Sequence, residues 1–153
     1  MIEIGKFVIA GDWDSAPTPA GKLRIVMPPL GHVEGAGWRN VTQAALLALP
    51  DHITPNCSFL DLGTGSGILS VAAKLLGAGH CYATELNPDA LDAARRVFAA
   101  NQVDIELIAG TFIDKEVDLA VVSISTQFYE QNKDRIHAKR ILVVHDDGFV
   151  EVV

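Results

Sequence analysis

A glycine-rich turn between an apolar strand and an apolar helix is the feature that most constrains this chain. The turn reads DLGTGSG over residues 61–67, after a predicted strand at residues 58–62 and before a predicted helix at residues 68–76. Glycine lets the backbone turn sharply and approach a ligand with no side chain between them. The turn therefore predicts the first strand-turn-helix unit of an α/β fold, with a ligand at the turn.

Two well-known nucleotide turns have a different spacing. A phosphate-binding P-loop ends in Gly-Lys-Ser/Thr, and here no lysine follows the turn until Lys74, which excludes that motif. The dinucleotide fingerprint G-x-G-x-x-G requires glycine where this sequence has Ile68. The spacing G-x-G-x-G leaves a nicotinamide-dependent enzyme only as a third alternative.

An acidic residue, Glu85, ends the next predicted strand at residues 80–85. Its carboxylate is suited to accept hydrogen bonds from both hydroxyls of a ribose. A ribose-bearing ligand without phosphate contacts fits S-adenosylmethionine. We expect Asp61 to face the ammonium of that cofactor through water, and the N–H groups of the turn to receive its carboxylate.

The remaining periodicities predict a Rossmann-like, doubly wound, mostly parallel α/β sheet. Asn87-Pro88 predicts a capped helix start, and Asp147-Gly148 predicts a closing antiparallel hairpin. Further predicted strands lie at residues 3–9, 22–27, 105–109, 119–124 and 140–144, and further helices at residues 40–49 and 128–138.

The length of 153 residues predicts one domain, with N-terminal strands and a loop at residues 1–37 and a cofactor-binding core at residues 38–153. A net charge of −7 argues against a nucleic-acid partner. No signal-peptide pattern or apolar run of membrane-spanning length is present, so we expect a cytoplasmic protein. Cys57 and Cys81 are expected as reduced core residues, and no metal site is predicted.

The runs DLGTGSG and ELNPDAL resemble the first two motifs of class I S-adenosylmethionine-dependent methyltransferases, and the resemblance extends from about Met27 to Val144. Within that class the chain is most similar to the methyltransferases of a large-subunit ribosomal stalk protein. Their run G-T-G-T-H-P-T-T is matched by GAGWRNVT, residues 35–42, in its two glycines and final threonine.

The resemblance implies a complete cofactor pocket. It assigns the amino-acid end of the cofactor to one group of residues: Thr42, Asp61, Gly63, Thr64 and Gly65. It assigns the ribose to Glu85 and the adenine to a second group: Leu86, Thr111 and Phe112. Ser123, at the end of the fourth core strand, is implied to lie beside the transferred methyl group and to position the acceptor.

Two departures from the family bear on catalysis. Ser123-Ile124 stands where the relatives have Asn-Ile, and Arg39-Asn40 replaces their His-Pro. The predicted sheet also has fewer than the usual seven strands, and the relatives' N-terminal recognition domain is not expected here. We therefore expect another subunit to cover an exposed sheet edge in a homo- or hetero-oligomer. Two functions remain: a methyltransferase acting on a protein or small-molecule amine or oxygen, or an inactive cofactor-binding or partner subunit.

Overall fold

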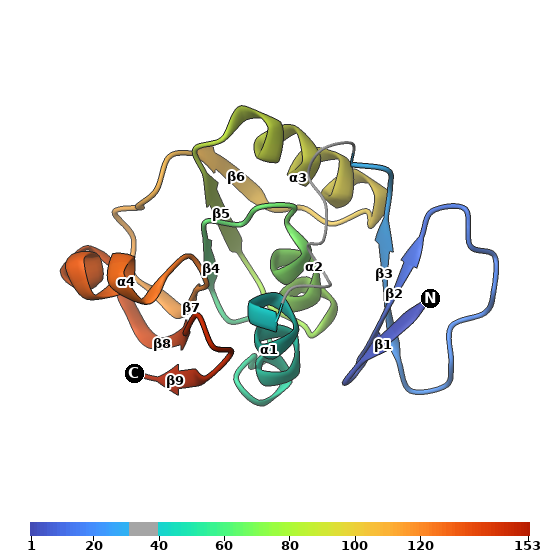
Figure 1. The fold of residues 1–153 in the computed structure, drawn as a ribbon, viewed down its shortest axis with the longest axis horizontal. Coiled ribbons are helices and arrows are strands. Elements are labelled where there is room, and N and C mark those ends of the chain that lie inside the picture. Colours follow the sequence, from blue (N-terminus) through green and yellow to red (C-terminus); the bar gives the residue numbers. More distant parts are fainter. Residues whose placement is uncertain (31–39) are drawn as a thin grey trace.

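A six-stranded sheet forms the centre of the computed structural model, which describes residues 1–30 and 40–153 (Figure 1). Its strand order is β6-β5-β4-β7-β8-β9, in which the first five strands are parallel and β9 is antiparallel. The strands are β4 (Phe59–Leu62), β5 (Cys81–Glu85), β6 (Glu106–Ala109), β7 (Val117–Val122), β8 (Ala138–Val144) and β9 (Val150–Val152). The order turns back between β4 and β7, which confirms the predicted doubly wound sheet.

Helices cover both faces of this sheet. The helices are α1 (Asn40–Ala48), α2 (Ile68–Leu75), α3 (Pro88–Ala100) and α4 (Thr126–Asn132). Side chains of α1, α2 and α3 share one buried cluster with Phe59 and Leu119 of the sheet, whereas Tyr129 of α4 belongs to a second cluster with Leu60 and Leu62. Alternate residues of β4 thus enter different clusters, as expected of a buried strand.

The start of α3 follows the predicted capping pattern. The side chain of Asn87 accepts hydrogen bonds from the N–H groups of Asp89 and Ala90 at 2.9 and 3.4 Å, and Pro88 occupies the first helical position. Proline has no N–H to leave unpaired there, and its backbone angle suits a helix. This cap fixes where the chain turns after Glu85.

The first predicted strand, at residues 3–9, is wrong in extent. The chain instead forms two antiparallel strands, β1 (Ile2–Ile4) and β2 (Phe7–Gly11), joined at Gly5, whose φ is 56°. Positive φ suits glycine, which has no Cβ to clash. Strand β3 (Leu23–Met27) then pairs parallel to β2, which makes a separate three-stranded sheet, at the right in Figure 1.

The small sheet packs onto the helices rather than onto the large sheet. Phe7, Ile9 and Ile25 are buried in the same cluster as Leu46 and Leu49, at and just after the end of α1. These side chains lie on alternate positions of their strands, so one face of the small sheet is apolar and inward-facing.

Asn101, just after α3, ties that helix to the small sheet. Its Oδ1 accepts a hydrogen bond from the Val26 N–H at 2.8 Å, and its Nδ2 donates to the Val26 carbonyl and to the Val97 carbonyl, each at 2.8 Å. One amide side chain thereby continues the hydrogen bonding of β3 and caps a helix end at the same time.

The closing hairpin of β8 and β9 confirms the prediction from Asp147-Gly148. Gly148 has a φ of 89°, its N–H donates to the His145 carbonyl, and β8 pairs antiparallel with β9. The His145 ring also lies 2.9 Å from the Thr126 hydroxyl and 2.8 Å from a Glu151 oxygen, which ties the hairpin to the start of α4.

The predicted helix at residues 128–138 is also wrong in extent. Helix α4 begins at Thr126, because the Ser125 side chain accepts the Phe128 N–H and caps it there. It ends at Asn132 and is followed by one 3₁₀ turn, Lys133–Arg135, before β8 begins at Ala138. The early end leaves only a short helix on this face of the sheet.

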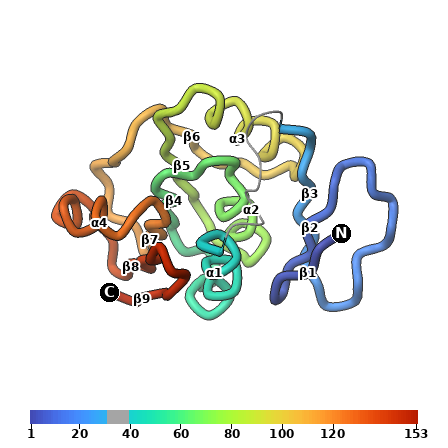
Figure 2. The backbone as a smooth tube through the Cα atoms, in the orientation of Figure 1, coloured from blue at the N-terminus to red at the C-terminus, as the bar shows by residue number. Residues whose placement is uncertain are grey.

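The two ends of the chain lie toward opposite ends of the long axis, the first with the small sheet and the last with β9 (Figure 2). Cys57 and Cys81 are free thiols buried in the larger cluster, as expected of core residues. Burial raises the pKa of the Cys81 thiol to about 12. Within residues 1–30 and 40–153, no helix has the length and apolarity needed to cross a membrane.

Candidate cofactor site

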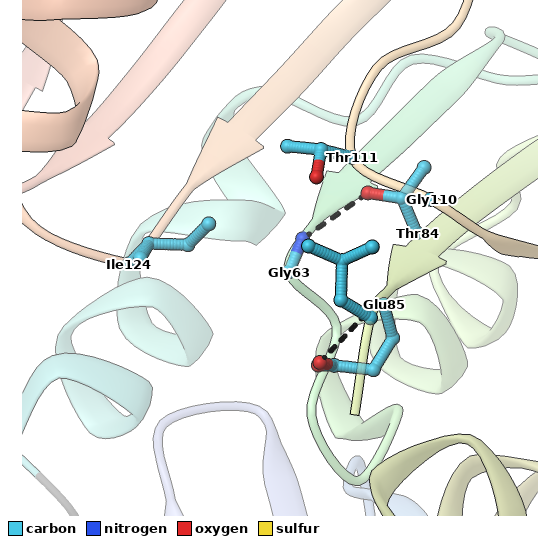
Figure 3. Close-up of a pocket in the computed structure, with 7 residues that line it drawn as sticks. Gly63, Thr84, Glu85, Gly110, Thr111 and Ile124 are labelled. Atoms are coloured by element: carbon cyan, nitrogen blue, oxygen red, sulfur yellow. Dashed lines mark hydrogen bonds between the residues drawn. The ribbon is translucent and has the colours of Figure 1, made fainter. Parts of the chain in front are cut away.

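A small open pocket of about 70 Å³ lies where four parallel strands of the large sheet reach their carboxyl ends (Figure 3). Ligands of doubly wound folds bind at this edge, at the point where the strand order reverses. The lining comes from the end of β5 and from the segments that follow β4, β5, β6 and β7: Gly63, Thr84, Glu85, Leu86, Gly110, Thr111 and Ile124. At about 30 Å³ per water, the pocket holds roughly two waters, so these residues enclose only part of a nucleoside.

The three glycines of the turn have different surroundings, although all three have positive φ. A Cβ placed on Gly65 would meet nothing within 4 Å, whereas one on Gly67 would lie 2.5 Å from the Phe98 ring of α3. A Cβ on Gly63 would lie 2.6 Å from the Ile124 side chain. Gly65 therefore presents bare backbone to open space, while Gly67 allows two helices to pack closely.

Glu85 connects the turn to the end of β5. Its Oε1 accepts a hydrogen bond from the Gly65 N–H at 2.9 Å, and its Oε2 accepts from the N–H groups of Leu86 and Asn87 at 3.0 and 3.1 Å. A carboxylate has about four acceptor positions, so three are used and one is free. The expectation that Glu85 holds both ribose hydroxyls thus requires one backbone N–H to release it.

Thr84 makes a second connection between β5 and the turn. Its hydroxyl accepts from the Gly63 N–H at 3.3 Å, and its carbonyl accepts from the Thr64 N–H at 2.8 Å (Figure 3 draws the first). Thr84 was not predicted as a site residue. Its position directly before the acidic strand end, next to the turn in a parallel sheet, is the signal that identifies it.

Asp61, predicted to face the cofactor ammonium through water, is fully buried beside the turn, and its role toward a cofactor stays a prediction. The side chain has no exposed surface, and its Oδ2 accepts hydrogen bonds from the Thr64 hydroxyl at 2.6 Å and the Ser70 hydroxyl at 2.9 Å. Burial raises the pKa of Asp61 to about 6, against the effect of these hydrogen bonds. Asp61 and Thr64 therefore hold the turn from inside instead of lining the pocket.

Two buried oxygens of this turn have no hydrogen-bond partner within the described part of the chain: Oδ1 of Asp61 and the Ser66 hydroxyl. Buried polar atoms without partners are rare and costly, and they concentrate where a structure serves a function other than stability. The turn thus combines backbone in left-handed conformation with unsatisfied polar groups.

The adenine side of the pocket is partly as expected. Leu86 is 68% exposed beside the pocket, and Thr111 lines it together with Gly110. Figure 3 shows Thr111 on the opposite side of Gly63 from Glu85. Leu86 and Thr111 are therefore available to a flat apolar ring that carries one hydrogen-bonding edge.

Phe112 does not line the pocket, which corrects its assignment to the adenine ring. Its ring stacks on Phe128 at 6.0 Å between centroids, and the Arg135 guanidinium lies 3.9 Å from its centroid. It packs against the cluster on the α4 face of the sheet. The chain direction after β6 places Thr111 at the pocket and turns the next side chain away.

The segment after β7 contributes one residue to the pocket lining. Ile124 lines the pocket and is 45% exposed, while the half-buried Ser123 and the α4 cap Ser125 do not line it. Thr42 is half-buried in α1 and also lies outside the lining. Residues 35–39 of the upstream run GAGWRNVT lie outside the described residues.

Comparison with known proteins gives the family. The family model for ribosomal protein L11 methyltransferase, PrmA, matches residues 2–138. This chain belongs to that family.

The ribosomal protein L11 methyltransferases of two bacteria are among its relatives. That of Caldicellulosiruptor saccharolyticus is 36% identical over 126 residues, which are 80% of this chain and 41% of the relative. That of Geobacillus thermodenitrificans is 37% identical over 125 residues, 78% of this chain and 40% of the relative. This chain thus spans well under half the length of these relatives.

A solved structure of the ribosomal protein L11 methylase from Lactobacillus delbrueckii subsp. bulgaricus has the same fold. It superposes with a TM-score of 0.75 at 24% identity, covering 90% of this chain and 75% of that one. The likeness confirms the Rossmann-like methyltransferase fold predicted from the alternation of strands and helices.

Few side chains in or near the pocket could act as an acid or a base. The only titratable side chain in its lining is Glu85, so the described residues bring no separate base to the pocket. Tyr129, one of the few acid-base candidates near β7, is buried against Leu60 and Leu62. The lining also includes Ile124, which the sequence analysis did not single out.

Proposed function

We propose that this chain binds S-adenosylmethionine at the glycine turn and transfers the methyl group to a protein acceptor, ribosomal protein L11. The observation that carries the proposal is the pairing of bare backbone at Gly65 with the Glu85 carboxylate, joined at 2.9 Å, at the carboxyl edge of the sheet. The relatives' names supply the acceptor. With a ribosomal acceptor, we also propose that the reaction takes place in the cytoplasm.

The residues present fit this cofactor. Gly65 has space for a ligand where any other residue would place a Cβ, and Glu85 retains one free acceptor position for a ribose hydroxyl. Leu86 and Thr111 offer an apolar surface and a hydroxyl beside the same pocket. The spacing of the turn, with Ile68 where the dinucleotide fingerprint has its third glycine, disfavours a dinucleotide.

S-adenosylmethionine supplies a methyl group on a sulfonium, which is already an activated leaving group. The protein needs to hold the acceptor atom in line with the methyl group and sulfur, which lowers the entropic part of the barrier. Ile124 lines the pocket and Ser123 precedes it just after β7, and we assign these two residues to positioning the acceptor through packing and one hydroxyl. An amine acceptor then has to lose its proton before it enters, since Glu85 is engaged by three N–H groups.

A second function rests on a specific observation. Among the residues that the structure describes, the pocket lining contains no acid or base besides Glu85, and Ser125 is committed to capping α4. A chain that binds the cofactor without transferring its methyl group, and that acts as a partner subunit, has the same turn. The two functions differ only in turnover.

Methyl transfer to purified L11 from S-adenosylmethionine carrying a radiolabelled methyl group separates them. We expect label in L11 from the wild-type chain and at least a tenfold lower rate from Glu85→Ala, with Glu116→Ala, an exposed matched control, unchanged. Cofactor binding without label in L11 or in a mixed small-amine pool would support the partner subunit. Label in small amines alone would assign a different acceptor.

A further inference from the structure

A second pocket lies at the opposite edge of the sheet from the glycine turn. It is formed where β4, β7 and β8 begin, and its volume is about 260 Å³. Its lining consists of His52, Thr54, Cys57, Asp118, Leu119, Lys139 and Arg140. At about 30 Å³ per water it holds roughly eight waters, and it shares no residue with the cofactor pocket.

The single carboxylate of this pocket is already neutralised. Oδ2 of Asp118 accepts the Ser58 N–H at 2.9 Å, and its Oδ1 lies 3.3 Å from the Lys139 ammonium. The Ser58 N–H first, and then Lys139, lower the pKa of Asp118, so it is ionised and balances the lysine charge. Asp118 is therefore unable to balance a second cation.

Arg140 is that second cation. Within the described residues it has no carboxylate partner, and its Nη1 lies 3.5 Å from Nδ1 of His52. Because guanidinium only donates, the imidazole nitrogen accepts in this contact. The Thr54 side chain, next to His52 in the lining, is exposed and adds a hydroxyl.

We propose that this pocket, with Arg140 and His52 as its main contacts, is a binding site for a small phosphate-bearing anion. The guanidinium fork matches two phosphate oxygens, and Thr54 and Lys139 lie in the same lining as further donors. The net charge of −7 repels a long polyanion, so a single phosphoryl group is favoured over RNA. The proposal is independent of the cofactor site.

Titration of the ¹⁵N-labelled chain with sodium phosphate, at ionic strength held constant with sodium chloride, tests it. We expect the backbone amides of His52, Thr54 and Arg140 to shift along one saturating curve with a midpoint of a few millimolar. Arg140→Gln should raise the phosphate concentration at that midpoint at least tenfold. Arg95→Gln removes the same charge from an exposed position of α3 and should leave it unchanged.

Three results would overturn the proposal. Shifts that do not saturate, or that weaken equally in Arg140→Gln and Arg95→Gln, would mean general charge screening. Tighter binding of an oligouridine than of inorganic phosphate or O-phosphoserine would mean an RNA contact instead. The amide spectra also report whether each variant is folded, so loss of structure is not mistaken for loss of binding.

Discussion

The carboxylate of Glu85 holds the backbone N–H of Gly65 at 2.9 Å, across the gap between the end of β5 and the glycine turn. The two residues are 20 positions apart, and the same carboxylate also accepts the N–H groups of Leu86 and Asn87. A ribose hydroxyl that binds Glu85 therefore donates to a carboxylate that already accepts three backbone hydrogen bonds. The turn and the acidic strand end work as one unit.

Glu85→Ala should weaken S-adenosylmethionine binding by about 1.5 to 3 kcal/mol, the range of hydrogen bonds to a charged group. Glu85→Gln should weaken it less, because the amide keeps one acceptor oxygen. Isothermal titration calorimetry measures both, with Glu116→Ala as the exposed control. Equal affinity in the wild type and a folded Glu85→Ala variant would show that the ribose is held elsewhere.

Gly65→Ala and Gly67→Ala should fail in different ways. An alanine at position 65 meets open space, so its cost is about 1 kcal/mol of left-handed backbone strain, and the main loss is cofactor binding. An alanine at position 67 adds overlap with the Phe98 ring and should cost at least about 2 kcal/mol more. Urea unfolding and calorimetry on both variants measure the two effects. Similar stability of the two variants would contradict the packing role of Gly67.

Asp61 should make the protein less stable as pH rises from about 4 to 6.5. Its pKa is raised by burial from 3.8 to about 6, so in that window the native state binds more protons than the unfolded state. The effect of this one group approaches about 3 kcal/mol. In Asp61→Asn this contribution is absent, so the stability of the variant relative to wild type should increase with pH.

Urea midpoints measured at half-unit pH steps report this difference. Asp104→Asn makes the same chemical change at an exposed position and should retain the wild-type trend. A constant difference between Asp61→Asn and wild type across the window would mean that Asp61 is not titrating there.

Asn101→Ala should loosen the small sheet from α3. The substitution removes three hydrogen bonds of 2.8 Å and leaves the Val26 N–H and carbonyl without that partner, at a cost of about 2 to 4 kcal/mol. Asn101→Asp keeps the acceptor but places a carboxylate oxygen against the Val26 and Val97 carbonyls, so it should destabilise at least as much. Hydrogen exchange at the Val26 amide should be faster in Asn101→Ala, and the unfolding midpoint of the same variant should be lower. An unchanged exchange rate would show that Asn101 does not hold β3 against α3.

The large sheet was predictable because its signals are local. The G-x-G-x-G turn, the Asn87-Pro88 cap and the Asp147-Gly148 hairpin each determine a boundary within a few residues. The N-terminal strand was wrong because Glu3 to Ile9 was read as one strand, whereas the chain turns back at Gly5, whose φ is 56° and which lies close to the Leu47 side chain of α1. The sequence around Gly5 does not reveal that contact, because Leu47 is distant along the chain.

The candidate site was predictable only in part, for a related reason. Residues at strand ends, such as Glu85 and Thr111, follow from the topology of a parallel sheet. Ile124 was missed because its role depends on facing Gly63 from another strand, and Phe112 was misassigned because Phe128 and Arg135 hold its ring. The hydrogen bonds of Asp61 to Thr64 and Ser70 were not predicted, because they depend on how the turn folds back onto α2.

Calorimetric titration of the wild-type chain with S-adenosylmethionine and, separately, with NAD tests the central claim most directly. The bare backbone at Gly65 and the acidic strand end at Glu85 predict saturable one-to-one binding of S-adenosylmethionine. The G-x-G-x-G spacing, with Ile68 in place of the third glycine of the dinucleotide fingerprint, predicts no measurable binding of NAD at the same concentrations. Absence of S-adenosylmethionine binding at millimolar concentration, or a preference for NAD, would contradict it.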